Sequence, residues 1–284
     1  MEADNALQSS LNLRKRLHID DQLDTACVYY NLGENFFTMG NGKKAVEAHR
    51  QALGLRETYL GEHVLTAISF DRVGSLYLKM GDYQSAIEPF QNALQLREKL
   101  LGNHVDTASS CHNLALTYFE TGSYSEALNL SQQALNIRLD LVPGHEETAD
   151  TFHLQGSIYS MMGDLVLASE AFLSSLNLRV ALLGEHQDTA MSYHCLGQAQ
   201  CDSGFYNEAL DSLLEACRLR KELLGDHSDT ATSLELLART YEALGADDLA
   251  SESLVFACEV RAKLMLEHCA VTATSGDSDN TTDS

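Results

Sequence analysis

The chain has 284 residues, 44% of them hydrophobic, with 19 Lys plus Arg against 41 Asp plus Glu and a net charge of −22. The apolar content is too high for a disordered chain, and the length favours two domains or an elongated array over a single core. The negative charge argues against nucleic acid and anionic lipid as partners and favours basic or neutral proteins.

Proline, cysteine and the N-terminal segment point to a cytoplasmic helical protein. The chain has only two prolines, Pro89 and Pro143, and this low count suits long helices, which tolerate little proline. The seven cysteines are odd in number and form no C-x-x-C pair, so we expect them to be reduced and buried. The sequence shows no signal segment and no apolar run of the roughly 20 residues that a membrane helix needs, so we expect no membrane insertion.

Residues 1–23 are predicted to form a lone helix followed by a turn. Residues 3–17 match the second half of the repeating unit described below, with Arg14 at the arginine position of that unit. The array therefore opens in the middle of a unit. Either this helix caps the array, or the sequence is part of a longer protein.

Residues 24–268 contain six copies of a 41-residue unit. A Thr-Ala pair opens each copy, and Gly, Ala and Arg follow 15, 20 and 31 residues after the Thr. The six threonines are Thr25, Thr66, Thr107, Thr148, Thr189 and Thr230. Four ladders with one fixed interval indicate a solenoid of stacked units.

Each unit is predicted to be a helical hairpin. In the third unit Cys111, Leu114, Ala115 and Tyr118 have the three- and four-residue spacing of a helix. The glycine after this helix adopts a left-handed cap cheaply and ends it. A small residue stands eight residues after the Thr, and we expect it to face the alanine of the second helix.

The second helix is expected to begin at a capping box and to end at a Leu-Gly-x-His turn. Ser123 and Glu126 form such a box in the third unit. Asp106, Asp188 and Asp229 are then candidates to cap the first helix of the following unit. Aromatic residues between the helices are interpreted as core, and no cofactor is predicted.

The last second helix is predicted to end near Leu266, and residues 269–284 read as a disordered acidic tail. No internal linker is evident, so the helical array is expected to form one elongated domain.

The small residue at the eighth step, the aromatic at the eleventh and the alanine at the twentieth resemble the tetratricopeptide pattern. The segment from Ala93 to His104 is similar to the kinesin light chain and nephrocystin-3 branch of that family. The resemblance covers about residues 3–268. It implies an all-α fold, a right-handed α-solenoid of tandem hairpins whose first helices line a concave peptide-binding groove.

Polar residues five and six steps into the first helices are the candidates for this groove. They are Asn31, Asp71, Arg72, His112, Asn113, His153, His194 and Glu235. Asn31 and Asn113 resemble the asparagine that contacts the peptide backbone in kinesin light chains, and an amide can both donate and accept hydrogen bonds. The alternative is that these positions form an ordinary solvated face.

A ladder of histidines recurs every 41 residues. It consists of His63, His104, His145, His186, His227 and His268. Stacked helices lie about 10 Å apart, whereas two nitrogens on one zinc ion lie within roughly 4 Å. We therefore predict a local role that ties the turn to a helix end, and no metal site.

No catalytic motif is found. Adjacent residues on a helix point in different directions, so Cys111 with His112 and His194 with Cys195 are poor thiol–base pairs. The arginine ladder is expected to pair with acidic neighbours. The sequence thus predicts a non-enzymatic scaffold or adaptor that binds peptides or partner proteins in the groove.

Three alternatives stay open. One is a cargo adaptor like kinesin light chain, which would need a heptad coiled coil that the sequence lacks. The others are a His/Cys metal protein or enzyme, and a purely structural module.

Overall fold

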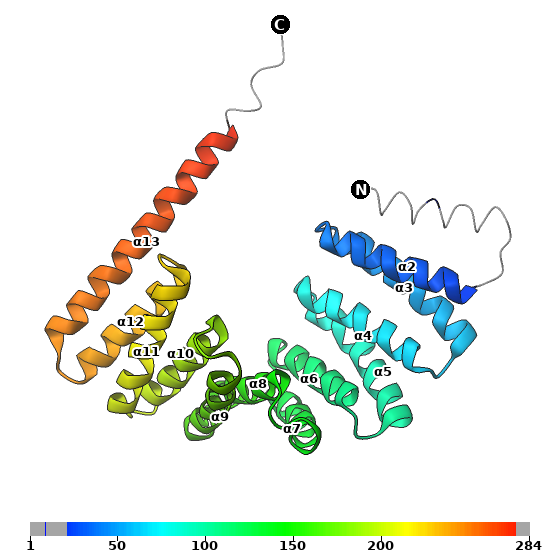
Figure 1. Cartoon of the computed structure of the whole chain (residues 1–284), viewed down its shortest axis with the longest axis horizontal. Coiled ribbons are helices and arrows are strands. Elements are labelled where there is room, and N and C mark those ends of the chain that lie inside the picture. The colour runs from blue at the N-terminus through cyan, green and yellow to red at the C-terminus, as the bar shows by residue number, and fades with distance from the viewer. Residues whose placement is uncertain (1–8, 10–21, 277–284) are drawn as a thin grey trace, which may run out of the picture. The chain divides into compact units, whose positions relative to one another are not determined.

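A computed structural model of the chain describes residue 9 and residues 22–276, with side chains described as far as Leu266. Every regular element within residues 22–276 is a helix (Figure 1). The helices are α2 (Gln22–Thr38), α3 (Gly42–Leu60), α4 (Val64–Lys79), α5 (Tyr83–Leu101), α6 (Val105–Glu120), α7 (Tyr124–Leu141), α8 (Glu146–Met162), α9 (Leu165–Leu183), α10 (Gln187–Asp202), α11 (Tyr206–Leu224), α12 (Ser228–Ala243) and α13 (Asp247–Gly276). The predicted all-α class of tandem hairpins is confirmed. The helix predicted within residues 1–23 lies outside the described residues.

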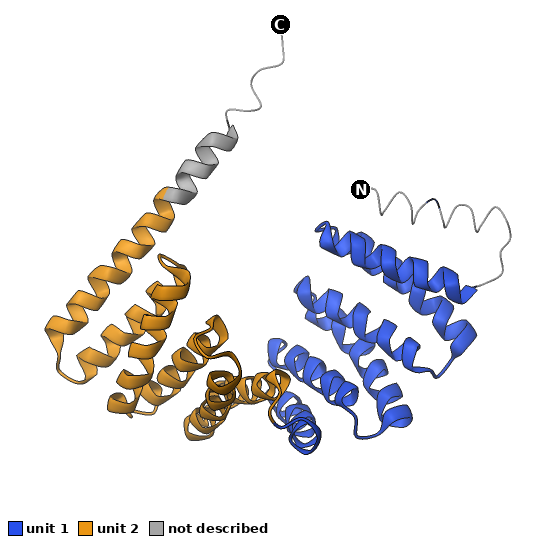
Figure 2. Ribbon diagram, in the orientation of Figure 1, with its two compact units in different colours: residues 1–143 blue, residues 144–284 orange. Residues whose placement is uncertain are grey.

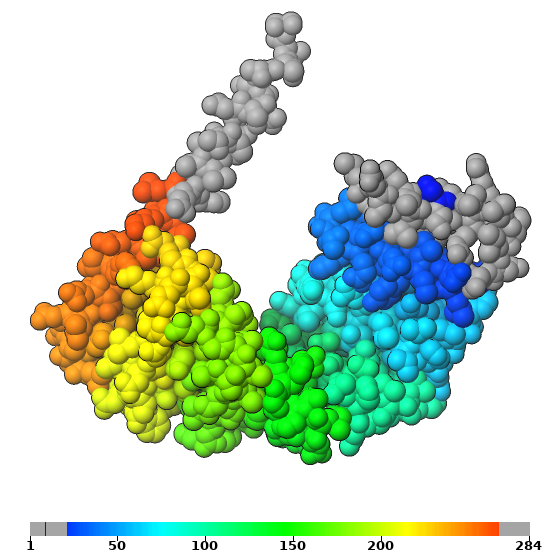
Figure 3. Space-filling model, viewed as in Figure 1, coloured from blue at the N-terminus to red at the C-terminus, as the bar shows by residue number. Residues whose placement is uncertain are grey.

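The helices divide into two compact units. Unit 1 holds hairpins one to three (α2 to α7) and unit 2 holds hairpins four to six (α8 to α13), coloured separately in Figure 2. The boundary falls at Pro143–Gly144, whereas the sequence analysis expects one domain without a break. Pro143 offers no backbone N–H and disfavours the helical conformation at Val142, so α7 ends at Leu141. Within each unit the helices pack into a continuous body (Figure 3).

The turn inside each hairpin is built by a glycine, as predicted. Gly81 has φ of +74°, and the N–H of Asp82 donates to the Tyr77 carbonyl oxygen at 2.9 Å. This bond satisfies a carbonyl at the end of α4, which is the geometry of a left-handed helix cap. The Asp82 carboxylate then accepts from the N–H of Ser85 at 3.3 Å and caps α5. Ser123 is the corresponding residue before α7, but its side chain forms no capping bond, so the predicted box is not made.

The turn between hairpins explains the histidine ladder. Gly102 (φ 59°, ψ −132°) reverses the chain, and His104 precedes α6 with extended backbone angles. The Nδ1 atom of His104 accepts a hydrogen bond from the N–H of Asp106 at 3.1 Å. At the other turns the equivalent bonds are accepted by Nδ1 of His63, His145, His186 and His227. The predicted local role is confirmed for these five, and the His268 side chain lies outside the described part.

Because histidine is the capping residue, the prediction that aspartates cap the first helices is wrong. Asp106, Asp188 and Asp229 lie in the first turn instead. There a carboxylate still stabilises the helix, because it faces the positive end of the helix dipole.

In hairpins one, two, four and five a small residue of the first helix lies beneath a large side chain of the second. A methyl group added at Gly74 would lie 2.9 Å from the Phe90 ring, and one at Gly156 would lie 2.7 Å from Phe172. The small residue therefore makes room for a large residue of the second helix. The predicted contact with the alanine of the second helix is found in hairpin five, where a methyl group at Gly197 would lie 3.4 Å from the Ala209 carbonyl oxygen, but the nearest group is the large side chain. In hairpin one the large residue is His49, which is fully buried.

A buried arginine joins each hairpin to the next within a unit. Arg97 of α5 is 6% exposed, and its Nη1 donates to the Asp106 carbonyl oxygen at 3.1 Å and to Ser110 Oγ at 2.6 Å. The same pair of bonds is formed by Arg56 with Leu65 and Ser69, by Arg179 with Asp188 and Ser192, and by Arg220 with Asp229 and Ser233. We call this set the arginine link.

The predicted pairing of this ladder with acidic residues is right only in part. Arg97 lies 3.4 Å from Asp71, and Arg179 lies 2.7 Å from Asp150. The bonds that recur from link to link are to neutral hydroxyl and carbonyl oxygens.

Two helices depart from the sequence prediction. α13 continues to Gly276 and not merely to about Leu266. Leu266 stands where Gly225 ends α11, and neither Gly nor Pro occurs from Asp247 to Ser275, so nothing stops the helix earlier.

α9 is also more apolar than expected. By length and composition it could cross a membrane, and a third of its apolar window is buried. In the structure Ala168, Phe172 and Leu176 of α9 belong to the core of unit 2.

Candidate functional site

The predicted groove residues of unit 1 lie on its first helices. Asn31 on α2 is exposed, whereas Asp71 and Arg72 on α4 and His112 and Asn113 on α6 are half-buried. All five stand five or six residues after the Thr of their hairpin. The structure thus brings residues that are 41 and 82 positions apart onto consecutive hairpins.

Two polar contacts connect these helices. Arg72 donates through Nε and Nη2 to the Glu34 carboxylate and so joins α4 to α2. Asp71 Oδ1 lies 3.4 Å from both Arg97 Nη1 and Asn113 Nδ2, which joins α4 to α5 and α6. Burial raises the pKa of Asp71, and the Arg97 guanidinium opposes that shift. Asp71 therefore helps to hold hairpin two against hairpin three.

An aromatic ring with two cations completes this surface. The Arg72 guanidinium lies 6.0 Å from the centroid of the Phe37 ring, and Lys79 Nζ lies 5.0 Å from it. Both distances are within the range of cation–π contacts. We name the residues Asn31, Phe37, Arg72, Lys79 and Asn113 the first-helix face of unit 1.

The predicted groove residues of unit 2 are occupied by internal contacts. The His153 ring packs edge-on against Phe172 at 5.2 Å. His194 Nδ1 lies 3.1 Å from Ser233 Oγ on the next hairpin. The Glu235 carboxylate accepts two bonds from Arg261, at 2.5 and 2.8 Å, which lowers its pKa.

Burial dominates the chemistry of the two histidines. Burial, and to a smaller extent the nearby Arg179 and Arg220 guanidinium groups, lower the pKa of His153 and of His194 to about 4. Both rings are therefore neutral at pH 7. We conclude that these side chains primarily connect helices, and a binding role for them stays a prediction.

The six cysteines whose side chains the structure describes are free thiols, but they are not uniformly buried. Cys27 and Cys258 are exposed, which corrects the expectation for these two. Burial raises the pKa of Cys111 to about 12 and of Cys195 to about 11, so neither thiol is activated by its histidine neighbour in the sequence.

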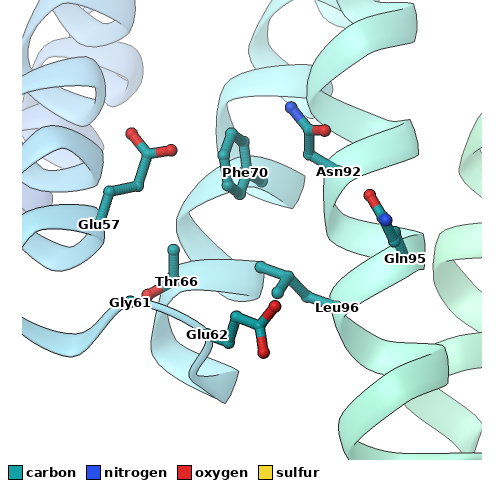
Figure 4. A pocket seen from close by; sticks show the side chains of 8 residues that line it. All are labelled: Glu57, Gly61, Glu62, Thr66, Phe70, Asn92, Gln95 and Leu96. Atoms are coloured by element: carbon teal, nitrogen blue, oxygen red, sulfur yellow. The ribbon is translucent and has the colours of Figure 1, made fainter.

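A shallow pocket of about 300 Å³ lies among α3, α4 and α5 of unit 1 (Figure 4). Phe70 and Leu96 form its apolar wall, and the carboxylates of Glu57 and Glu62 border it. Glu62 is already paired with Lys99. Sequence reasoning did not find this pocket, because it depends on the separation of consecutive hairpins, which periodicity leaves undefined.

Comparison with protein families identifies the repeat. The tetratricopeptide repeat family matches residues 1–58, 26–99, 64–140 and 188–262, which together make up more than half of the chain. No curated protein sequence matches the chain.

Solved structures show the same fold. BtubC (BKLC) from P. vanneervenii is 20% identical with a TM-score of 0.67, covering 79% of this chain and 90% of that one. The TPR-like repeats of a P. anserina protein described as a kinesin light chain are 26% identical with a TM-score of 0.63, covering 72% and 98%. The apo form of RapI is 15% identical with a TM-score of 0.65, covering 85% and 99%.

Proposed function

This chain belongs to the tetratricopeptide repeat family, and from that premise we propose that it is a scaffold that binds an extended segment of a partner protein on the first-helix face of unit 1. Members of this family are generally protein-interaction scaffolds. The proposal names the face, the form of the ligand and its charge.

The observation that carries the proposal is the pair of amides Asn31 and Asn113. They occupy equivalent positions on α2 and α6, two hairpins apart. The Asn31 side chain bonds to no described residue, and Asn113 uses one N–H on Asp71, which leaves its carbonyl oxygen available. An amide offers two donors and one acceptor, so it can pair with the main chain of any sequence.

The separation of the two amides suits an extended strand. Consecutive hairpins stack at about 10 Å, so α2 and α6 lie about 20 Å apart. An extended chain advances about 3.3 Å per residue, so roughly six residues would connect the two amides. Arg72 lies on α4, between α2 and α6, where Glu34 holds it 6.0 Å from the Phe37 ring of α2, and both side chains can contact the bound segment.

The expected partner is basic or neutral. The net charge of −22 attracts basic segments over long distances and repels acidic ones. On the face itself Glu34 and Asp71 offset Arg72 and Lys79, so selectivity would depend on shape and hydrogen bonding as well as on charge. A cargo adaptor like kinesin light chain is the narrower form of this proposal, and the likeness to the P. anserina repeats supports it.

We extend the proposal to chemistry and location. The raised pKa values of Cys111, Cys195 and Cys217 keep these thiols protonated at neutral pH, which supports a non-enzymatic role. The free cysteines support a reducing compartment, and we propose the cytoplasm.

The test is to select binders from a random peptide library on the immobilised chain and to measure their affinity by fluorescence anisotropy. The double variant Asn31→Ala, Asn113→Ala should lose about 2 kcal/mol, or about thirtyfold in affinity, for two neutral hydrogen bonds. The matched control is Asn129→Ala, Asn136→Ala, two exposed amides on α7. Equal loss in both variants would reject the proposed face.

A further inference from the structure

The second helices of unit 2 expose a row of aliphatic side chains. Leu173 on α9 is 47% exposed, Leu214 on α11 is 42% exposed and Val255 on α13 is 59% exposed. The three positions are 41 residues apart and therefore equivalent in their hairpins. We call them the apolar row. In unit 1 the same position holds Arg50, Gln91 and Gln132, so the repeat does not need an apolar side chain there.

Exposed side-chain contacts bridge the second helices of consecutive hairpins within unit 2. Arg218 of α11 pairs with Glu185, just after α9, at 3.0 Å. Lys221 Nζ of α11 lies 4.6 Å from the Phe256 ring of α13. The row therefore crosses the second helices of three consecutive hairpins. Packed helices lie about 10 Å apart and these are no closer, so the row is at least about 20 Å long.

The row continues along α9. Val166 and Val180 stand seven residues before and after Leu173 and are also exposed. Seven residues are two helical turns, so all three lie on one side of α9. At the Val166 position the other hairpins have polar residues, which are Lys43, Gln84, Ser125, Asn207 and Asp248. α9 is thus apolar toward solvent where its counterparts are polar.

A row of carboxylates runs beside the apolar row. Glu170, Asp211 and Glu252 stand one helical turn before Leu173, Leu214 and Val255 and are exposed. None of the three side chains pairs with another described residue. The nearby cations are already engaged: Arg218 contacts Glu215, Glu222 and Glu185 at 2.9, 2.9 and 3.0 Å. We call Glu170, Asp211 and Glu252 the acidic row.

From this pairing of rows we propose that the second helices of unit 2 bind an amphipathic helix of a partner protein that carries aliphatic residues beside Lys or Arg. The row is at least about 20 Å long, so a partner helix needs at least about fourteen residues, or four turns, to cover it. Its aliphatic side would cover the three exposed side chains, and its cations would meet the three unpaired carboxylates.

The negative charge of the acidic row favours a basic amphipathic helix over a second copy of the chain or a lipid surface. A second copy of the chain would bring two acidic rows together, and anionic lipid would meet the same carboxylates, so both are repelled. The surface is also distinct from the first-helix face of unit 1. The two proposals can therefore fail independently.

The test measures binding of two designed 18-residue helical peptides, one of Leu and Lys and one of Leu and Glu, to the full chain by fluorescence anisotropy. The Leu–Lys peptide should bind, more weakly at high salt, and the Leu–Glu peptide should not. Leu173→Gln, Leu214→Gln, Val255→Gln, which installs the side chain of unit 1, should weaken binding at least tenfold. Asn31→Ala, Asn113→Ala should leave it unchanged.

Charge variants guard against general attraction to an acidic protein. Glu170→Gln, Asp211→Asn, Glu252→Gln should weaken the Leu–Lys peptide and flatten its salt dependence. The matched control, Glu47→Gln, Glu88→Gln, removes the equivalent unit 1 carboxylates and should have little effect. The proposal is overturned if the Leu–Lys peptide binds the apolar-row variant as well as the native chain. It is also overturned if anionic vesicles bind the native chain and release the apolar-row variant.

Discussion

The arginine link between hairpins two and three allows a quantitative test. Arg97→Met keeps most of the apolar stem and removes the guanidinium, which donates to Asp106 at 3.1 Å and to Ser110 at 2.6 Å. Hydrogen bonds from a charged group contribute about 1.5–3 kcal/mol each, so we expect a loss of about 3–4 kcal/mol. Ser110→Ala removes one acceptor and should cost about 1–2 kcal/mol. The double variant should then show a coupling energy of about 1.5 kcal/mol.

The assay is urea unfolding followed by circular dichroism, together with native-state hydrogen exchange in α6, because coupled hairpins can open separately. Arg218→Met is the control. Arg218 contacts three carboxylates but is exposed, so solvent screens these ion pairs and its replacement should destabilise the chain much less than that of Arg97. A coupling energy near zero, or equal losses from Arg97→Met and Arg218→Met, would refute the view that the buried link joins the hairpins.

Three histidines supply the remaining predictions. His49 is fully buried, and its Nε2 lies 3.3 Å from Glu34 without forming a hydrogen bond. His49→Phe should therefore raise the free energy of unfolding by about 1–2 kcal/mol in urea unfolding; a decrease would mean that hairpin one cannot hold the ring that hairpins two and four hold. His104→Ala should speed hydrogen exchange in the first turn of α6 by loss of about 1 kcal/mol, and His104→Asn should restore most of it, because asparagine also caps helices. Equal exchange in both variants would contradict the capping role. Burial lowers the pKa of His153 to about 4 in the native state, against about 6.5 when unfolded. The unfolded chain therefore takes up a proton between pH 6.5 and 4 that the native chain does not, and stability should fall through that window by roughly 3 kcal/mol. His153→Leu should reduce this dependence in urea unfolding at a series of pH values, and an unchanged slope would contradict it.

Local turn chemistry made the fold predictable from the sequence. Gly81 and its equivalents end the first helix because the chain needs a left-handed residue there, and the fixed 41-residue spacing shows that the requirement recurs. The sequence does not show which residues of the two helices in a hairpin pack against each other. The apolar stripe of α5 does not reveal which of its residues meets Gly74, and so Phe90 was missed as the centre of hairpin two. At Leu266 the glycine that ends α11 at the equivalent position is absent, and α13 therefore continues.

The sequence predicts on which helix face the candidate site residues lie, but not which side chains they contact. Helical periodicity places Asn31, Arg72 and Asn113 on one side of the first helices. Whether Arg72 meets solvent or Glu34 depends on the rotation between consecutive hairpins, which no sequence interval encodes. The contacts of His153 and His194 could not be predicted either, because packing against Phe172 and Ser233 decides how exposed these two side chains are.

Site-specific photocrosslinking tests the central claim most directly. A photoreactive phenylalanine analogue would replace Asn31 on the first-helix face in one variant and Asn129 on α7 in another, both exposed positions of unit 1. Each variant would be irradiated with a peptide selected on the native chain, and adducts would be read by mass spectrometry. The proposal predicts adducts from position 31 and little or none from position 129. Adducts from position 129 alone would place the partner on the second helices and contradict it.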